Sequence, residues 1–163
     1  RYGTVTGVQT CALPISRQEI ISESRSLGLD TVFFPEESRA ATMTLTSWRR
    51  DVDTVLAGLD MVALTSWNEG TPVSLIEAQA AGKPIITTRV GGIENAVIPD
   101  QTAILVSPGS VDEFHVALES VAFSEKKRQD MSAAGWEFVR EKYHYSRLIE
   151  DMKQHYDLLL RKA

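Results

Sequence analysis

Two glutamates, Glu69 and Glu77, flank a predicted strand-to-helix turn with seven residues between them. Residues 60–65 form a short apolar run, which is typical of a strand buried on both faces of a parallel sheet. Residues 68–70 end this run, and the pattern predicts a helix over 72–81. The two carboxylates are therefore expected at the carboxyl end of a strand, where a helix begins.

The start of that helix has the features of an anion site. We expect Thr71 to be the N-cap and Pro72 to be the first helical residue, where its missing N–H costs nothing. The backbone N–H groups of Val73, Ser74 and Leu75 would then point out of the helix end. Such donors, together with the helix dipole, stabilise an anion and most often a phosphate.

Glu77 shares a predicted helix face with Ser74 and Ala81, and this face looks back toward the helix start. Glu69 lies in the loop on the opposite side of the same anion site. The alternative is that both glutamates are ordinary surface carboxylates, and their spacing alone leaves that alternative open.

The residues around the two glutamates resemble the retaining glycosyltransferases of family 4, which have the GT-B fold. The resemblance is carried by Glu69-Gly70-x4-Leu75-x-Glu77-Ala78-x-Ala80-Ala81-Gly82-x-Pro84, an apolar strand, and Val90-Gly91-Gly92. In that family the two glutamates of the E-x7-E motif bind a nucleotide-sugar donor. The resemblance implies that Glu69, the catalytic candidate, contacts hydroxyls of the transferred sugar and that Glu77 accepts hydrogen bonds from the ribose diol.

Further donor contacts follow from the same resemblance. The backbone after Glu69 matches the segment that cradles the diphosphate, and Gly91 and Gly92 match paired glycines beside the donor. The implied binding residues are Gly70, Thr71, Pro72, Val73, Ser74, Leu75, Glu77, Gly91 and Gly92. The glycines would allow close backbone approach or a positive φ, although an ordinary loop is as good an explanation for these two residues alone. Asn95 departs from the family, because a glutamate is common at that position.

The function that this resemblance implies is transfer of a sugar from a nucleoside diphosphate sugar, most simply a UDP-sugar, to an unknown acceptor. It implies no cofactor and no bound metal, and no Asp-x-Asp metal motif is evident apart from Asp51-Val52-Asp53, which is better explained by a helix start. One alternative is a non-catalytic nucleotide-binding or assembly module. A dinucleotide oxidoreductase or a P-loop NTPase ranks lower, because neither glycine-rich motif is present.

Residues 5–15 resemble one translated reading frame of a sequencing adaptor. We therefore expect residues 1–16 to be artefactual and residues 17–163 to be a C-terminal nucleotide-sugar-binding domain cut at its N-terminal side. The acceptor-binding N-terminal domain of the family and its Gly-Arg…Lys element would be missing. The fragment alone is then expected to be inactive, although its intact parent would be an enzyme.

Composition fits one compact domain of 163 residues, with 43% hydrophobic and 24% charged residues. The formal net charge of −5 argues against a nucleic-acid-binding surface. We find no apolar run long enough to span a bilayer and expect a cytoplasmic location, with attachment to the inner membrane face left open.

The remaining elements alternate in a way that predicts an α/β fold, a Rossmann-like, doubly wound parallel sheet followed by helices. Strands are expected at 30–34, 60–65, 84–88 and 103–106, and helices at 17–28, 52–59, 72–81, 111–123, 126–141 and 146–162. Ligands bind such sheets at the carboxyl ends of the strands.

Two segments leave questions open. The last predicted helix has a stripe at helical spacing that contains Leu148, Met152, either His155 or Tyr156, and Leu159. This stripe is expected either to pack on the chain's own core or, as in GT-B enzymes, to reach the missing N-terminal domain. Residues 35–47 have no counterpart in the family pattern, and we expect them to form a surface loop or short helix.

Overall fold

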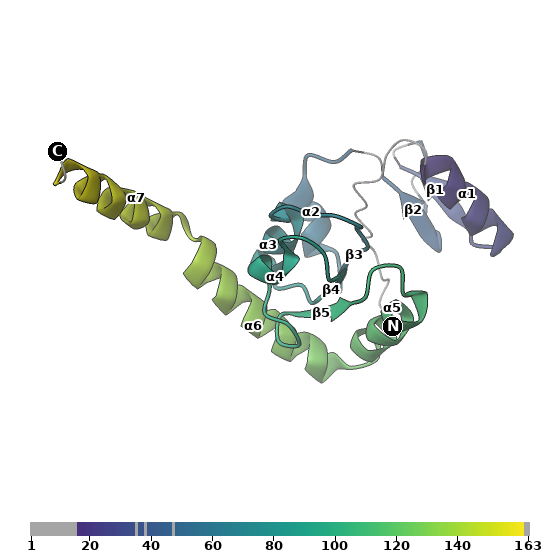
Figure 1. Cartoon of the computed structure of the whole chain (residues 1–163). Helices are drawn as coiled ribbons and strands as arrows, with labels where there is room; N and C mark the ends of the chain where they lie inside the picture. Colours follow the sequence, from purple (N-terminus) through teal and green to yellow (C-terminus); the bar gives the residue numbers. More distant parts are fainter. Residues whose placement is uncertain (1–15, 35, 38, 47, 162–163) are drawn as a thin grey trace.

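The computed structural model describes residues 16–34, 36–37, 39–46 and 48–161. The segment 5–15, which resembles an adaptor, lies outside the described residues. The five strands are β1 (Thr31–Phe33), β2 (Met43–Leu45), β3 (Val62–Leu64), β4 (Ile85–Thr88) and β5 (Ala103–Val106). The helices are α1 (Ser16–Ser26), α2 (Val52–Ala57), α3 (Val73–Ala80), α4 (Ile93–Ala96), α5 (Val111–Ala122), α6 (Glu125–Tyr143) and α7 (Tyr145–Leu160) (Figure 1).

The main sheet contains β3, β4 and β5 in that order, and every pairing is parallel. Ile85 of the central strand lies opposite Val62 on one side and Ala103 on the other. Helices separate the strands along the chain, because parallel neighbours need a crossover connection. The α/β fold with a parallel sheet, expected from the sequence, is therefore confirmed.

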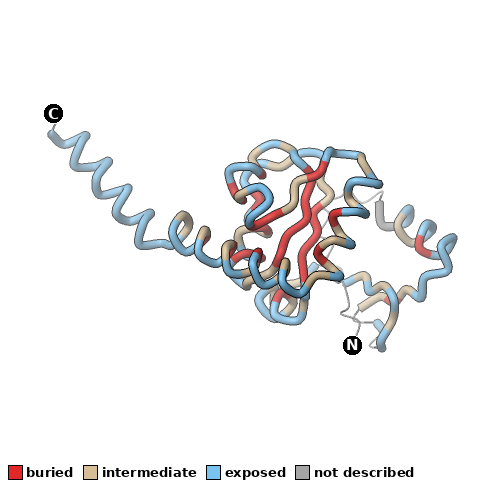
Figure 2. Tube along the Cα trace, turned by 90° about the horizontal axis from the view of Figure 1, so that it is seen from below, coloured by how far each residue is buried: buried red, intermediate tan, exposed pale blue. Residues whose placement is uncertain are grey.

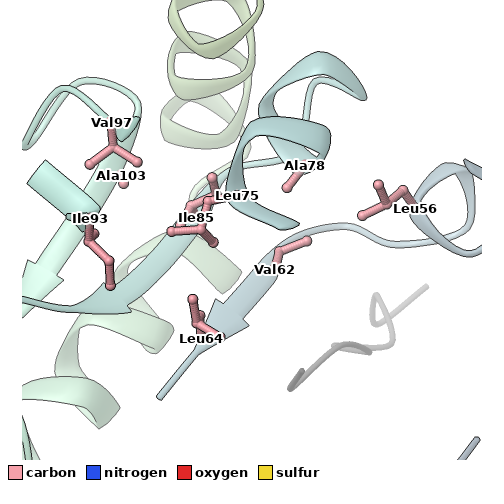
Figure 3. Packing of buried hydrophobic residues seen from close by; sticks show 9 residues of the cluster. All are labelled: Leu56, Val62, Leu64, Leu75, Ala78, Ile85, Ile93, Val97 and Ala103. Carbon is pink, nitrogen blue, oxygen red and sulfur yellow. The ribbon is translucent and has the colours of Figure 1, made fainter. Parts of the chain in front are cut away.

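Both faces of this sheet are covered. Figure 2 shows a buried centre surrounded by helices that are buried on some residues and exposed on others. Alternate residues of each strand point to opposite faces, so Ile85 joins one hydrophobic cluster and Ile86 joins the other. The first cluster contains Leu56, Val62, Leu64, Leu75, Ala78, Ile85, Ile93, Val97 and Ala103 (Figure 3). The second contains Met61, Ile86, Val106, Ala117, Val121 and Met131.

Helix α3 is held in the first cluster and has a well-defined end. Its inner face buries Leu75, Ala78 and Gln79. At its C-terminus Gly82 has φ +65°, its N–H donates to Gln79 O at 2.9 Å, and Lys83 N–H donates to Ala78 O at 2.9 Å. These two bonds form a Schellman motif, which requires the left-handed conformation that glycine adopts readily.

The segment 35–47 is the main error of the sequence-based prediction. Instead of a loop or short helix, its described part contains β2, which pairs in parallel with β1 in a separate two-stranded sheet. Arg39 in the connection forms a two-pronged ion pair with Asp30, with Nη1–Oδ2 and Nη2–Oδ1 distances of 2.5 and 2.8 Å. The Arg39 guanidinium lowers the pKa of Asp30 below its usual range. The connection is thus tied back to the residue that precedes β1.

The C-terminal helices differ in how they are packed. Helix α6 packs against α3 and α5, and its buried residues are Met131, Gly135 and Val139. Helix α7 has no buried residue and projects away from the body in Figures 1 and 2. The apolar stripe of α7 therefore does not pack on the core of this chain.

We expect Leu75→Ala to destabilise the chain by about 2–5 kcal/mol, because Leu75 is 0% exposed and its removal leaves a cavity under α3. The matched control is Leu158→Ala on α7, where the side chain is 58% exposed and the change should stay within about 0.5 kcal/mol. Urea denaturation followed by circular dichroism measures both. Similar losses for the two variants would contradict this packing.

Candidate functional site

Three loops meet at the carboxyl edge of the main sheet, one after each strand. The loop after β3 carries Glu69, the loop after β4 carries Gly91 and Gly92, and the loop after β5 carries Gly109. Parallel strands place these loops at the same edge, which is the usual ligand-binding edge of such sheets.

Gly91 and Gly92 contact the turn after β3 through backbone atoms. A Cβ added to Gly91 would lie 1.9 Å from Glu69 O, and one added to Gly92 would lie 2.2 Å from Gly70 O. Gly91 also has φ +50°, and the Gly92 N–H donates to Glu69 O at 3.0 Å. These glycines are therefore required by the contact between the two loops, because any side chain would push the loops apart.

The Glu69 side chain has a defined partner. The Ser66 hydroxyl donates to Glu69 Oε1 at 2.6 Å, and Glu69 is half-buried. The buried Thr88, the last residue of β4, donates its hydroxyl to Ser66 O at 2.5 Å. Neither Ser66 nor Thr88 was singled out in the sequence, although a hydroxyl residue three positions before the glutamate was a usable signal.

The start of α3 differs in detail from the prediction. Pro72, with ψ 91°, occupies the N-cap position, and the helix begins at Val73. The prediction of Thr71 as N-cap is therefore wrong, because the carbonyl of Pro72 makes the first turn by accepting from the N–H groups of Leu75 and Ile76. Leu75 N–H is thereby used within the protein.

Two amides at this helix start keep their donors available. Within the described chain, the N–H groups of Val73 and Ser74 donate to no protein acceptor. Both residues lie in the first turn of α3, where the helix dipole adds partial positive charge. Two of the three amides that the sequence analysis singled out are thus without a protein acceptor in the described chain.

Glu77 lies one turn further along α3 and is exposed, as is Ala81 on the same face. The opposite face of the helix is anchored by Gln79, which is 0% exposed and whose Nε2 donates to Leu75 O at 3.0 Å and to Ala96 O at 2.8 Å. The buried anchor fixes the rotation of α3, so Glu77 faces solvent on the side that also carries Ser74.

The loop after β5 completes the edge. Trp67 is 74% exposed, and its ring lies against Gly109, where an added Cβ would be 2.7 Å from Cη2. Glu113 holds this loop by accepting from Ser107 N–H at 2.8 Å through Oε2. The hydrogen bond from this backbone N–H lowers the pKa of Glu113 below its usual range.

Charge at this edge is partly neutralised. Arg89, the residue after β4, forms an ion pair with Glu94 of α4. Among the described residues, no group of three or more His, Cys, Asp or Glu side chains could hold a metal ion, and no helix of that part of the chain is long and apolar enough to cross a membrane. The edge therefore offers backbone donors, two carboxylates and an arginine engaged by a carboxylate.

The structure brings the predicted residues together at one edge, from Glu69 through Leu75 to Gly91 and Gly92. Asn95, where the family commonly has glutamate, lies in α4 and is exposed. Its backbone carbonyl accepts from Tyr143 Oη at 2.9 Å and from Lys142 Nζ at 2.5 Å. This residue therefore links the loop after β4 to the end of α6 through its main chain.

We expect Gly91→Ala to destabilise the chain by about 2–4 kcal/mol, from the left-handed backbone and the overlap with Glu69 O. Gly70→Ala in the facing turn is the control, because no atom lies within 4 Å of its added Cβ and the expected change is under about 0.5 kcal/mol. Thermal unfolding measures both, and equal melting temperatures would contradict the close contact.

The Glu113 hydrogen bond should make stability pH-dependent. Because the folded pKa of Glu113 lies below its unfolded value, its stabilisation is fully present above the unfolded pKa and is lost as pH falls through the folded pKa. We expect Glu113→Gln to lower the urea midpoint at pH 7 and to match the wild type at acidic pH. A difference that persisted unchanged at low pH would contradict this role.

Comparison with curated proteins finds relatives named D-inositol 3-phosphate glycosyltransferase. The chain is 36% identical over 83 residues to the D-inositol 3-phosphate glycosyltransferase of Corynebacterium diphtheriae, covering 51% of this chain and 19% of that protein. It is 31% identical over 97 residues to the protein of the same name from an Arthrobacter strain, covering 52% and 23%. The chain thus spans about a fifth of the length of these relatives.

Solved structures show the same fold at low sequence identity. HepE of Anabaena, in complex with UDP, has a TM-score of 0.77 at 18% identity, covering 94% of this chain and 41% of that one. Sucrose-phosphate synthase from Thermosynechococcus elongatus has a TM-score of 0.73 at 20% identity, covering 98% and 38%. The C-terminal domain of LpcC, a group 1 family protein of Francisella tularensis, has a TM-score of 0.65 at 20% identity, covering 80% and 63%.

The family model for glycosyl transferases group 1 matches residues 36–138. This match begins inside the segment 35–47. It also contains β3, α3, β4 and β5, which build the edge described above. With more than half of its residues in this match, the chain belongs to the group 1 glycosyl transferases.

Proposed function

We propose that this chain is the donor-binding part of a retaining, family 4 glycosyltransferase that transfers a sugar from a nucleoside diphosphate sugar, with the E-x7-E glutamates binding the donor. The observation that carries the proposal is the direct contact of Gly91 and Gly92 with the turn that bears Glu69. The turn carries the Glu69 carboxylate, and the helix start with unused amides follows it a few residues later along the chain. A sugar nucleotide needs both features, an acceptor for hydroxyls and donors for phosphate.

The roles of the residues follow from their chemistry. The N–H groups of Val73 and Ser74 donate to the diphosphate, and the backbone from Gly70 to Leu75 lines it. Glu77, exposed one turn along α3, accepts from the adjacent hydroxyls of a ribose. Glu69 accepts from hydroxyls of the transferred sugar.

The proposed donor carries uridine. The Anabaena protein with the same fold was solved with UDP and with UDP-glucose, which supports UDP as the first nucleotide to test. The acceptor is left unassigned, because loops and domains outside the shared fold select it. The proposed reaction needs no cofactor and no resident metal ion.

The donor site also needs positive charge for the leaving diphosphate. Arg89 at this edge is already paired with Glu94. This pairing supports a further proposal, that the positive charge comes from a Gly-Arg…Lys element. In this proposal that element and the acceptor-binding domain both belong to an N-terminal part of a longer parent protein. The exposed stripe of α7 fits such a parent, because Leu148, Met152 and Leu159 have no cover on this chain. By itself this chain would bind the donor without transferring the sugar. The proposed location is the cytoplasm, with attachment to the inner membrane face as the alternative.

A non-catalytic nucleotide-binding or assembly module is the alternative. It uses the same amides and Glu77 for a nucleotide but gives Glu69 no sugar to contact. The two functions differ in whether a sugar attached to the diphosphate changes affinity through Glu69.

We expect the 163-residue chain to bind UDP saturably and Glu77→Ala to weaken this binding about tenfold to a hundredfold, because hydrogen bonds to a charged acceptor are lost. Isothermal titration calorimetry measures the affinities. Glu150→Ala on the exposed helix α7 is the control and should bind as the wild type does. Equal affinity of wild type and Glu77→Ala would refute the ribose assignment.

A further inference from the structure

We propose, on the basis of the function proposed above, that Ser66 is a positioning residue for Glu69 and that Thr88 holds Ser66 in place. The Glu69 carboxylate is then fixed in the free protein, before a donor arrives. The chemical class of ligand that this arrangement serves is the hydroxylated sugar ring of a nucleotide sugar.

The contact between Ser66 and Glu69 is short and directional. An ionised carboxylate can only accept, so the single hydroxyl proton of Ser66 is directed to Oε1, at 2.6 Å. Hydrogen bonds to a charged acceptor are shorter and stronger than neutral ones. Both side chains are partly removed from solvent, so water competes less for this bond than at an open surface.

Thr88 connects this pair to the buried main sheet. It ends β4, the central strand of the main sheet, and is 4% exposed. The last registered pair between β3 and β4 is Leu64 with Thr87. Beyond it the hydroxyl of Thr88 donates to Ser66 O at 2.5 Å, so a side chain continues the link between the two strands.

The main chain of Glu69 is fixed by a different residue. Gly92 N–H donates to Glu69 O at 3.0 Å, and this bond does not involve Ser66. Loss of the Ser66 hydroxyl should therefore leave the turn in place while the Glu69 side chain samples other rotamers. The two effects can be separated by experiment.

The arrangement leaves the carboxylate able to bind. Within the described chain Oε1 accepts from Ser66 and Oε2 has no partner. A carboxylate has about four acceptor positions, so most of its capacity remains for ligand hydroxyls. An acceptor that is already oriented binds more tightly, because less side-chain freedom is lost on binding.

The first test measures side-chain order without any ligand. We expect ¹³C relaxation of Glu69 Cγ to show a clear loss of order in Ser66→Ala and a smaller loss in Thr88→Val, and recovery in Ser66→Thr, which restores the hydroxyl. Thr65→Val is the matched control, since the Thr65 hydroxyl makes no hydrogen bond within the described chain. Unchanged order of Glu69 in Ser66→Ala overturns the positioning role, whatever the chain binds.

The second test uses UDP and UDP-glucose as probes for the full chain. We expect Ser66→Ala to lower affinity for UDP-glucose about tenfold and to leave affinity for UDP within twofold, because only the sugar reaches Glu69. Ser66→Thr should restore the affinity. Adding Ser66→Ala to Glu69→Gln should have little further effect, since Ser66 acts through Glu69.

The outcomes separate this role from the proposed function. If Ser66→Ala disorders Glu69 but every variant binds UDP and UDP-glucose equally, the positioning role stands and the sugar-binding role of Glu69 fails. If Glu69→Gln alone weakens UDP-glucose binding while Ser66→Ala changes neither order nor affinity, the donor site stands and the positioning role is overturned.

Discussion

The close approach of two backbones, at Gly91 and Gly92 on one side and Glu69 and Gly70 on the other, sets the arrangement of the whole edge. Atoms this close leave no room for a side chain. The loops after β3 and β4 are therefore in direct main-chain contact. The contact fixes the main chain of the turn that carries Glu69 and leads into α3. The candidate site therefore depends on main-chain shape more than on side-chain packing.

The same loop is tied down at its far end by α4, a helix of four residues that is too short to be stable alone. Gln79 of α3 donates to Ala96 O, and Tyr143 of α6 donates to Asn95 O. Two longer helices thus hold α4 through its carbonyl groups. The loop with Gly91 and Gly92 thus lies between the buried strand β4 and the anchored helix α4. Both of its ends are fixed, which explains how a loop without regular structure keeps its close contact with the turn after β3.

The elements with strong local patterns could be predicted from the sequence. Residues 103–106 were predicted with correct bounds, and α3 and β4 within one residue at each end, because apolar runs and glycine or proline stops define them. β2 could not be predicted, since three residues of mixed polarity carry no period and the strand exists only by pairing with β1. The prediction of Thr71 as the N-cap was wrong, because the first hydrogen bonds of α3 are accepted by the carbonyl of Pro72.

The candidate site divides in the same way. Glu69 and Glu77 stand in a local motif and were visible in the sequence, and so were the paired glycines. Ser66 left only a local signal, a hydroxyl residue three positions before Glu69, and Thr88 left none, because its bond to Ser66 O depends on the pairing of two strands, which a single sequence does not display. The contact between Trp67 and Gly109 is also a product of tertiary structure.

Helix α7 and the main sheet are expected to differ in their local stability. The sixteen residues of α7 bury no side chain, so its backbone hydrogen bonds are supported by local terms alone, and isolated helices of about this length are marginal in water. We therefore expect α7 to unfold locally without disturbing the sheet, and its amide protons to exchange with solvent far faster than those of β4. Proteases would reach α7 through this local opening while the donor-binding edge stays folded.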